Sequence, residues 1–151
     1  MVVSSELASS TSFAKSTSVA NALCGVRVLV IEDVWIIAQS YVSLLDNLGA
    51  IVSGPACTIA EAMSLIEAAP IDAALVDMNL HGEMAYGVVE ALNSRGVPVV
   101  VATGYDVVPE LEHKVCAFLR KPIRAEALIK SMRSIAGAGL DCPGATAVPP
   151  S

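Results

Sequence analysis

The sequence has few aromatic residues, no long apolar run and no excess of positive charge. Phe, Trp and Tyr make up 4% of the 151 residues although 54% are hydrophobic, so mainly aliphatic side chains must form the core. A core of Val, Leu, Ile and Ala is typical of a parallel sheet that is buried on both faces. The length favours one domain with tails.

These and other absences exclude classes of protein. No apolar run reaches the ~18 residues that a membrane-spanning helix needs, and the amino terminus lacks a signal-peptide pattern, so we expect a cytoplasmic protein without a membrane partner. The net charge of −6 argues against nucleic acid as a partner. No Cys-x-x-Cys pair is present, and we expect four reduced thiols. They are Cys24, Cys57, Cys116 and Cys142.

Polar or breaker-rich segments flank the part of the chain that can fold. Residues 1–24 are rich in Ser and Thr, and residues 137–151 hold several Gly and Pro residues. Neither segment has enough apolar periodicity to bury a core. We therefore expect two flexible tails around a single domain at 25–136.

Between the tails, strand patterns and helix patterns alternate, which predicts five β/α units with right-handed crossovers. Such units form a doubly wound five-stranded parallel sheet, here with the flavodoxin-like strand order 2-1-3-4-5. The strands are expected at about 26–32, 50–54, 72–77, 97–102 and 116–119. The helices are expected at about 35–48, 58–69, 84–94, 107–113 and 123–136.

The fourth helix has little room. Residues 104–120, seventeen in all, separate Thr103 from Lys121, and Pro109 interrupts them. Proline removes a hydrogen bond from a helix interior and clashes with the preceding turn. We therefore expect this helix to be short or mobile.

Polar side chains stand where four of the strands end. Glu32 and Asp33 close the first strand, and Asp77 closes the third. Thr103 follows the fourth strand, and Lys121 follows the fifth. Ligands of open parallel sheets bind at this carboxyl edge. Three carboxylates that converge there would repel one another, so we expect a cation and a lysine to hold them.

This constellation resembles the receiver domain of two-component response regulators over about residues 25–136. Within that family, the segment 101–105, Val-Ala-Thr-Gly-Tyr, is similar to the Ala-Thr-Gly-Tyr segment of short, stand-alone bacterial receivers. The resemblance implies that Asp77 accepts a phosphoryl group from a sensor histidine kinase or a histidine phosphotransfer protein. The output would be a phosphorylation-dependent contact with an unknown downstream protein, or a role as a phosphate sink or relay.

The same resemblance implies the roles of the other acids. Mg²⁺ would be bound directly by Asp33, by Asp77 and by the backbone carbonyl of Asn79. Glu32 would act on the metal through water. Lys121 would pair with Asp77 at rest and with a phosphoryl oxygen afterwards.

A switch is also implied. The hydroxyl of Thr103 would shift toward the new phosphate, and an aromatic residue would repack into the vacated space. Phe118 stands at the family's position for that residue, and it is equally suited to a plain core role. Tyr105 is a second candidate, as switch or as lid. The resemblance further implies a cis Lys121–Pro122 bond.

Two other functions remain open. A haloacid-dehalogenase-like phosphohydrolase also uses a strand-end aspartate, Mg²⁺ and a lysine, but it needs a second acid where this chain has Asn79. A phosphate-independent binding module is opposed by the intact acids, Thr103 and Lys121. The leading expectation is therefore a signalling protein whose only chemistry is self-phosphorylation and slow self-dephosphorylation at Asp77.

Overall fold

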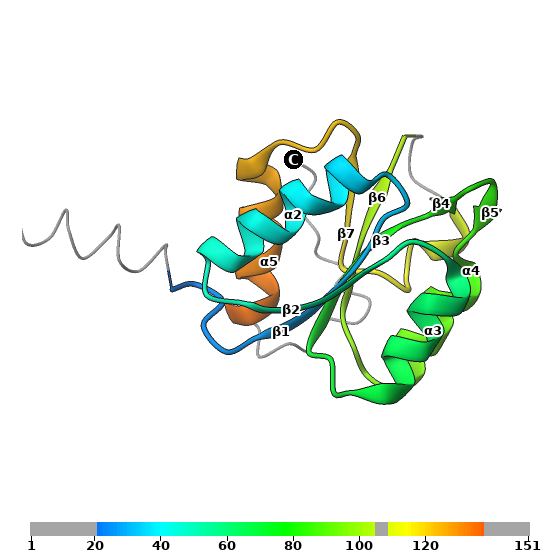
Figure 1. Ribbon diagram of the computed structural model, residues 1–151, viewed down its shortest axis with the longest axis horizontal. Coiled ribbons are helices and arrows are strands. Elements are labelled where there is room, and N and C mark those ends of the chain that lie inside the picture. The colour runs from blue at the N-terminus through cyan, green and yellow to red at the C-terminus, as the bar shows by residue number, and fades with distance from the viewer. Residues whose placement is uncertain (1–20, 105–108, 138–151) are drawn as a thin grey trace, which may run out of the picture.

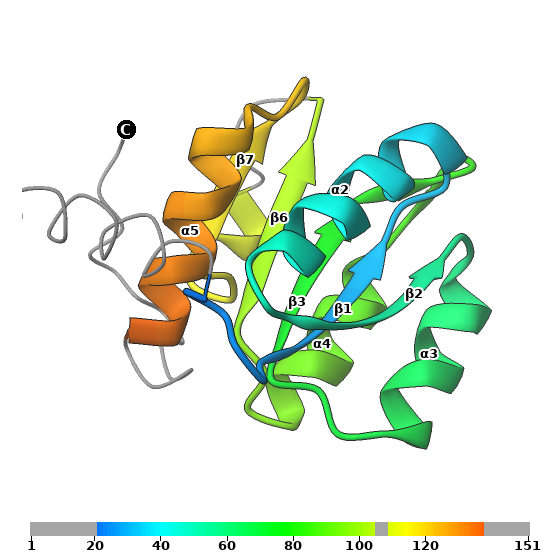
Figure 2. The ribbon, with the colours of Figure 1, turned by 60° about the vertical axis from the view of Figure 1, so that its left-hand side comes forward.

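The computed structural model describes residues 21–104 and 109–137, and they form a parallel five-stranded sheet between two layers of helices (Figure 1, Figure 2). The strand order is β2-β1-β3-β6-β7, which confirms the expected order 2-1-3-4-5. The strands are β1 (Arg27–Ile31), β2 (Ile51–Ala56), β3 (Ala73–Asp77), β6 (Val99–Thr103) and β7 (Ala117–Arg120). The helices are α2 (Trp35–Asn47), α3 (Ile59–Ala68), α4 (Tyr86–Ser94) and α5 (Ala125–Gly137).

Alternation along each central strand divides the core into two halves. In β1, Val28 and Val30 pack into the cluster that contains α2 and α5. Leu29 and Ile31 pack into the opposite cluster, beneath α3 and α4. All four side chains are at most 1% exposed. Because successive residues of a strand point to opposite faces, a continuous apolar run suits a strand that is covered on both sides.

The edge strand β2 differs from the sequence prediction. The strand was expected to end at about residue 54, but β2 continues through Gly54 and Pro55 to Ala56. Proline is tolerated in an edge strand because its missing N–H would face outward. Gly54 has φ +94, and a Cβ there would stand 2.7 Å from the carbonyl oxygen of Val30. Glycine is therefore required where β2 passes β1.

The helix expected at 107–113 is short, as predicted. Its described part is a 3-10 helix, η1, at Pro109–Leu111, and residues 105–108 lie outside the described part. One element was not predicted: an antiparallel hairpin of β4 (Asn79–Leu80) and β5 (Glu83–Met84) between β3 and α4. Strands of two residues are too short to show any periodicity.

Leu23 is 1% exposed and packs in the core, so the packed part of the chain includes a residue just before the expected start.

Cys24 and Cys57 are free, but Cys116 is disulfide-bonded, so the expectation of four reduced thiols is wrong for Cys116. Sequence spacing alone does not reveal which cysteines pair. Within the described residues, every helix is too short or too polar to cross a membrane.

Candidate functional site

Three carboxylates meet at the carboxyl edge of the sheet, where β1 and β3 end. Oxygen atoms of Glu32, Asp33 and Asp77 all lie within 4.8 Å of one another. Glu32 is fully buried and Asp77 is 4% exposed. Parallel strands that end at one edge bring these acids together, as the sequence predicts. Such a concentration of buried negative charge requires compensation.

Lys121 supplies part of this compensation. Its Nζ donates hydrogen bonds to Glu32 Oε2 at 2.9 Å and to Asp77 Oδ2 at 3.0 Å. Burial lowers the pKa of the ammonium, but the bonds to Glu32 and Asp77 outweigh it, so the net pKa is raised. The Lys121–Pro122 peptide bond is cis, as expected. Lys121 therefore bridges the ends of β1 and β3 as a cation.

A lysine was expected to hold the converging carboxylates, but a specific bond was expected only with Asp77, so the close contact with Glu32 is additional. The second carboxylate oxygen of Glu32 accepts a hydrogen bond from the backbone N–H of Val34 at 3.1 Å. Burial raises the pKa of Glu32 to about 7, although the bonds from Lys121 and Val34 act in the opposite direction. Glu32 is thus a carboxylate whose charge is costly without a further cation.

Asp33 is held from the other side, by the hairpin of β4 and β5. The backbone N–H of His81 donates to Asp33 Oδ2 at 3.0 Å, and the imidazole Nδ1 lies 3.5 Å from the same oxygen. Burial by itself raises the pKa of Asp33, but the hydrogen bond from the His81 N–H is the largest opposing effect, and the net pKa is lowered. Asp33 therefore stays ionised.

Asn79 lies beside the aspartate of β3. Its backbone N–H donates to Asp77 Oδ1 at 3.1 Å, and its side-chain oxygen accepts the N–H of Gly82 at 2.8 Å. Both oxygens of Asp77 are thus engaged at rest, one by this N–H and one by Lys121. These contacts hold the carboxylate of Asp77 in a defined orientation.

The described residues include two of the three proposed switch residues, Thr103 and Phe118. Thr103 ends β6 and is 3% exposed, and its carbonyl accepts the N–H of Lys121 at 2.8 Å. Phe118 pairs in register with Val101 and packs partly buried against the core under α3 and α4. Tyr105 lies outside the described residues. The structure therefore brings Thr103 to the same edge as the acids.

The donor set fits Mg²⁺. This ion prefers carboxylate and carbonyl oxygens and keeps several waters, and the three acids converge within a few ångströms. Burial raises the pKa of Glu32, and a cation beside this carboxylate would favour its ionised form. Asp33, Asp77 and the nearby backbone of Asn79 are the residues that could hold the ion.

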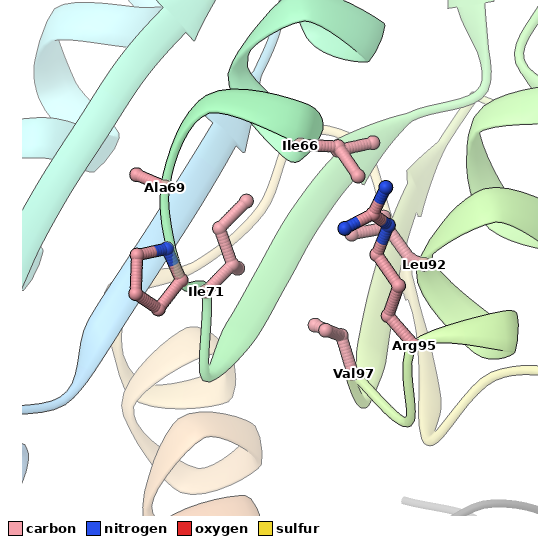
Figure 3. Close-up of a pocket in the computed structure, with 7 residues that line it drawn as sticks. Ile66, Ala69, Ile71, Leu92, Arg95 and Val97 are labelled. Atoms are coloured by element: carbon pink, nitrogen blue, oxygen red, sulfur yellow. The ribbon is translucent and has the colours of Figure 1, made fainter.

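A separate cavity lies at the opposite, amino-terminal edge of the sheet (Figure 3). Its volume is about 240 Å³, and it is mainly apolar with one guanidinium, that of Arg95. The lining residues are Ile66, Ala69, Pro70, Ile71, Leu92, Arg95 and Val97. None of them is an acid or a nucleophile, so this cavity is not the place for phosphoryl chemistry.

Comparison with protein families gives a match over most of the chain. A family model described as the response regulator receiver domain matches residues 28–133. The matched segment includes each acid of the cluster, Thr103 and Lys121. A search of curated proteins found no match.

Solved structures show the same fold. A CheY-like receiver domain protein from Methanospirillum hungatei JF-1 superimposes with a TM-score of 0.69 at 23% identity, covering 76% of this chain and 95% of that one. A CheY-like receiver domain from Methylobacillus flagellatus gives 0.65 at 24% identity, covering 74% and 98%. The receiver domain of a sensor histidine kinase from Pseudomonas aeruginosa PAO1, with a magnesium ion coordinated in its active-site cleft, gives 0.66 at 22% identity, covering 76% and 99%.

Proposed function

Because the chain belongs to the response regulator receiver domain family, we propose that it accepts a phosphoryl group on Asp77 from a phosphohistidine. The observation that carries this proposal is the position of Asp77 at the end of β3. Its carboxylate stands 3.0 Å from the ammonium of Lys121 and within the acidic cluster of Glu32 and Asp33. A carboxylate so placed is a nucleophile with a cation beside it.

The reaction is a transfer from nitrogen to oxygen. A carboxylate oxygen of Asp77 forms a bond to phosphorus as the P–N bond of the phosphohistidine breaks. The departing imidazole nitrogen keeps the electron pair and takes up a proton. Lys121 stabilises charge on the phosphoryl oxygens, because an ammonium already aimed at Asp77 needs little reorganisation.

Asp33, Asp77 and the backbone carbonyl of Asn79 would hold Mg²⁺ directly, and Glu32 would act through water. The bound ion supplies positive charge for the phosphoryl oxygens. The convergence of the acids supports this assignment.

The donor is a sensor histidine kinase or a histidine phosphotransfer protein, and we place the exchange in the cytoplasm of a bacterium. The output is a phosphorylation-dependent contact with another protein, or a role as phosphate sink or relay. Thr103 is suited to the switch because it ends β6 beside Lys121. Phe118 and Tyr105 remain the two aromatic candidates that could respond to it.

A phosphohydrolase of the haloacid-dehalogenase type is the less favoured alternative. That chemistry needs an acid two residues after the nucleophile, and here the side chain of Asn79 instead accepts the N–H of Gly82. An amide cannot donate the proton that such a general acid supplies. A phosphate-independent binding module would leave the convergence of acids and lysine without a purpose.

One assay separates the three functions. The purified chain is incubated with Mg²⁺ and a small phosphoramidate or acyl phosphate donor, and the mass of the intact protein is followed. A receiver gains one phosphoryl group and then loses it slowly. In a parallel incubation with a phosphate ester, multiple turnover would favour the hydrolase, and no gain of mass with the donor would favour the binding module. Asp77→Asn is the control, because it keeps the side-chain shape and removes the nucleophile.

A further inference from the structure

The hairpin of β4 and β5 is built around a tight turn at His81 and Gly82. Asn79 pairs with Met84 and Leu80 pairs with Glu83, which leaves two residues in the loop. The φ angles of the loop residues are +53 at His81 and +89 at Gly82. Positive φ at both central residues is the signature of a type I′ turn. A non-glycine residue in this region is uncommon, so the conformation of His81 must be stabilised by its surroundings.

The hairpin is anchored to the domain at its base. Leu80 is 1% exposed and belongs to the core under α3 and α4. The N–H of Ala85 donates to the carbonyl of Met78 at 2.8 Å, which closes the base of the hairpin. Within it, Asn79 Oδ1 accepts the N–H of Gly82 at 2.8 Å. Because its base packs in the core and an internal hydrogen bond closes it, the turn has a defined position relative to the domain.

The turn points one backbone donor at the acidic cluster. In this turn the backbone nitrogen of His81 lies 3.0 Å from Asp33 Oδ2 and donates its N–H to it, although the two residues lie 48 positions apart. The bond engages Oδ2 of Asp33, and the carboxylate as a whole stands within the acidic cluster. Backbone donors that orient a metal-binding carboxylate strengthen binding because the ligand no longer has to be ordered.

We propose that the His81–Gly82 turn is a positioning element for Asp33, which orients this carboxylate toward Mg²⁺ and thereby sets the affinity of the site. The proposal rests on the proposed function only for the identity of the ion. The orienting effect on Asp33 comes from the backbone N–H of residue 81 rather than from the imidazole, because the side chain of His81 is 62% exposed.

The test compares two glycines. Gly82→Ala and Gly96→Ala each put a side chain on a residue with positive φ, +89 and +72, and a Cβ at either position meets no atom within 4 Å. Both variants therefore suffer similar backbone strain and should lose similar stability. Gly96 follows α4 at the far edge of the sheet, so only Gly82→Ala disturbs Asp33.

The affinity for Mg²⁺ is measured by calorimetry on the unphosphorylated full chain. We expect Gly82→Ala to weaken binding on the order of tenfold and Gly96→Ala to leave it unchanged. Equal affinities in the two variants would overturn the proposal, as would a wild-type chain that binds no Mg²⁺. If the Mg²⁺ affinities follow this pattern but the phosphorylation assay fails, the result counts against the proposed function alone.

Two substitutions at residue 81 separate the backbone from the imidazole. Asparagine tolerates positive φ whereas valine, a β-branched residue, does not. His81→Asn should therefore lose less Mg²⁺ affinity than His81→Val. In the metal-free protein the amide of His81 should exchange slowly with solvent, and Asp33→Ala should accelerate it. Equal losses in the two variants, or an exchange rate that ignores Asp33, would show that the turn does not position this carboxylate.

Discussion

Replacement of Lys121 by methionine should destabilise the metal-free protein strongly. Lys121 bridges Glu32 and Asp77 at 2.9 and 3.0 Å, and the side chains of these acids are 0% and 6% exposed. Removal of the ammonium leaves two buried carboxylates that face each other without a cation. Breaking a buried ion pair in this way typically costs 3–5 kcal/mol, and because Lys121 is itself partly exposed we expect about 3 kcal/mol.

The loss should depend on pH and on Mg²⁺. The pKa of Lys121 is raised above its usual value, so the stability that its charge contributes is fully present at neutral pH and is lost only as the pH rises through that raised pKa. Burial raises the pKa of Glu32 to about 7, so mild acid neutralises it and should reduce the penalty of Lys121→Met. Mg²⁺ should reduce the penalty as well, because it supplies the missing positive charge.

Urea unfolding measures both effects, with Lys114→Met as the matched control. Lys114 pairs with Glu90 at 2.6 Å, but those side chains are 44% and 60% exposed. An exposed pair contributes little to stability, so the control should unfold nearly as the wild type does. The reasoning is refuted if Lys121→Met costs no more than Lys114→Met, or if its penalty is the same in mild acid, at neutral pH and with Mg²⁺.

Three further predictions concern other parts of the structure. Trp35 is 65% exposed two residues after Asp33, so its fluorescence should change in step with Mg²⁺ binding measured by calorimetry, and a flat signal would contradict its placement at the site. Burial raises the pKa of Glu32 from its usual value to about 7. In the metal-free protein Glu32 therefore contributes stability that is lost as the pH rises from about 4.5 to 7. The affinity for Mg²⁺ should strengthen over the same interval, and a pH-independent affinity would contradict this prediction. Leu23 is 1% exposed, so Leu23→Ala should cost about 2–4 kcal/mol in urea unfolding, whereas Ile36→Ala, at a side chain that is 75% exposed, should change it little.

Much of the fold could be predicted from local patterns. Continuous apolar runs such as Ala73–Val76 mark strands that are buried on both faces, and the structure places them there. A threonine followed three residues later by a glutamate, as at Thr58 and Glu61, is a local signal for the start of a helix, and in the structure Thr58 Oγ1 accepts the N–H of Glu61 at 3.1 Å. Such signals are readable because the physics that produces them acts between residues close in the sequence.

Features that depend on contacts between distant residues could not be predicted in the same way. The extension of β2 through Gly54–Pro55 depends on its place at the edge of the sheet. The bond from His81 to Asp33 depends on a hairpin whose strands have two residues each. A glycine after His81, between Leu80 and Glu83, was the one local signal for that turn, and it is weak without knowledge of the pairing.

The contacts of the site also divide into those that local patterns predict and those that depend on distant residues. Strand ends predicted that Glu32, Asp33 and Asp77 converge, and the structure brings them together. The sequence did not predict that Lys121 bonds to Glu32 as closely as to Asp77. That contact joins residues 89 positions apart, after the ends of β7 and β1, so only the assembled sheet brings them together.

The most direct test of the central claim is to locate the phosphoryl group. The chain is phosphorylated by a small donor in the presence of Mg²⁺ and then treated with borohydride, which reduces an acyl phosphate to an alcohol. Peptide mass mapping should find this change at Asp77 alone, and it should be absent without Mg²⁺ and in Asp77→Asn. Modification at a histidine or at another carboxylate, or none at all, would contradict the account.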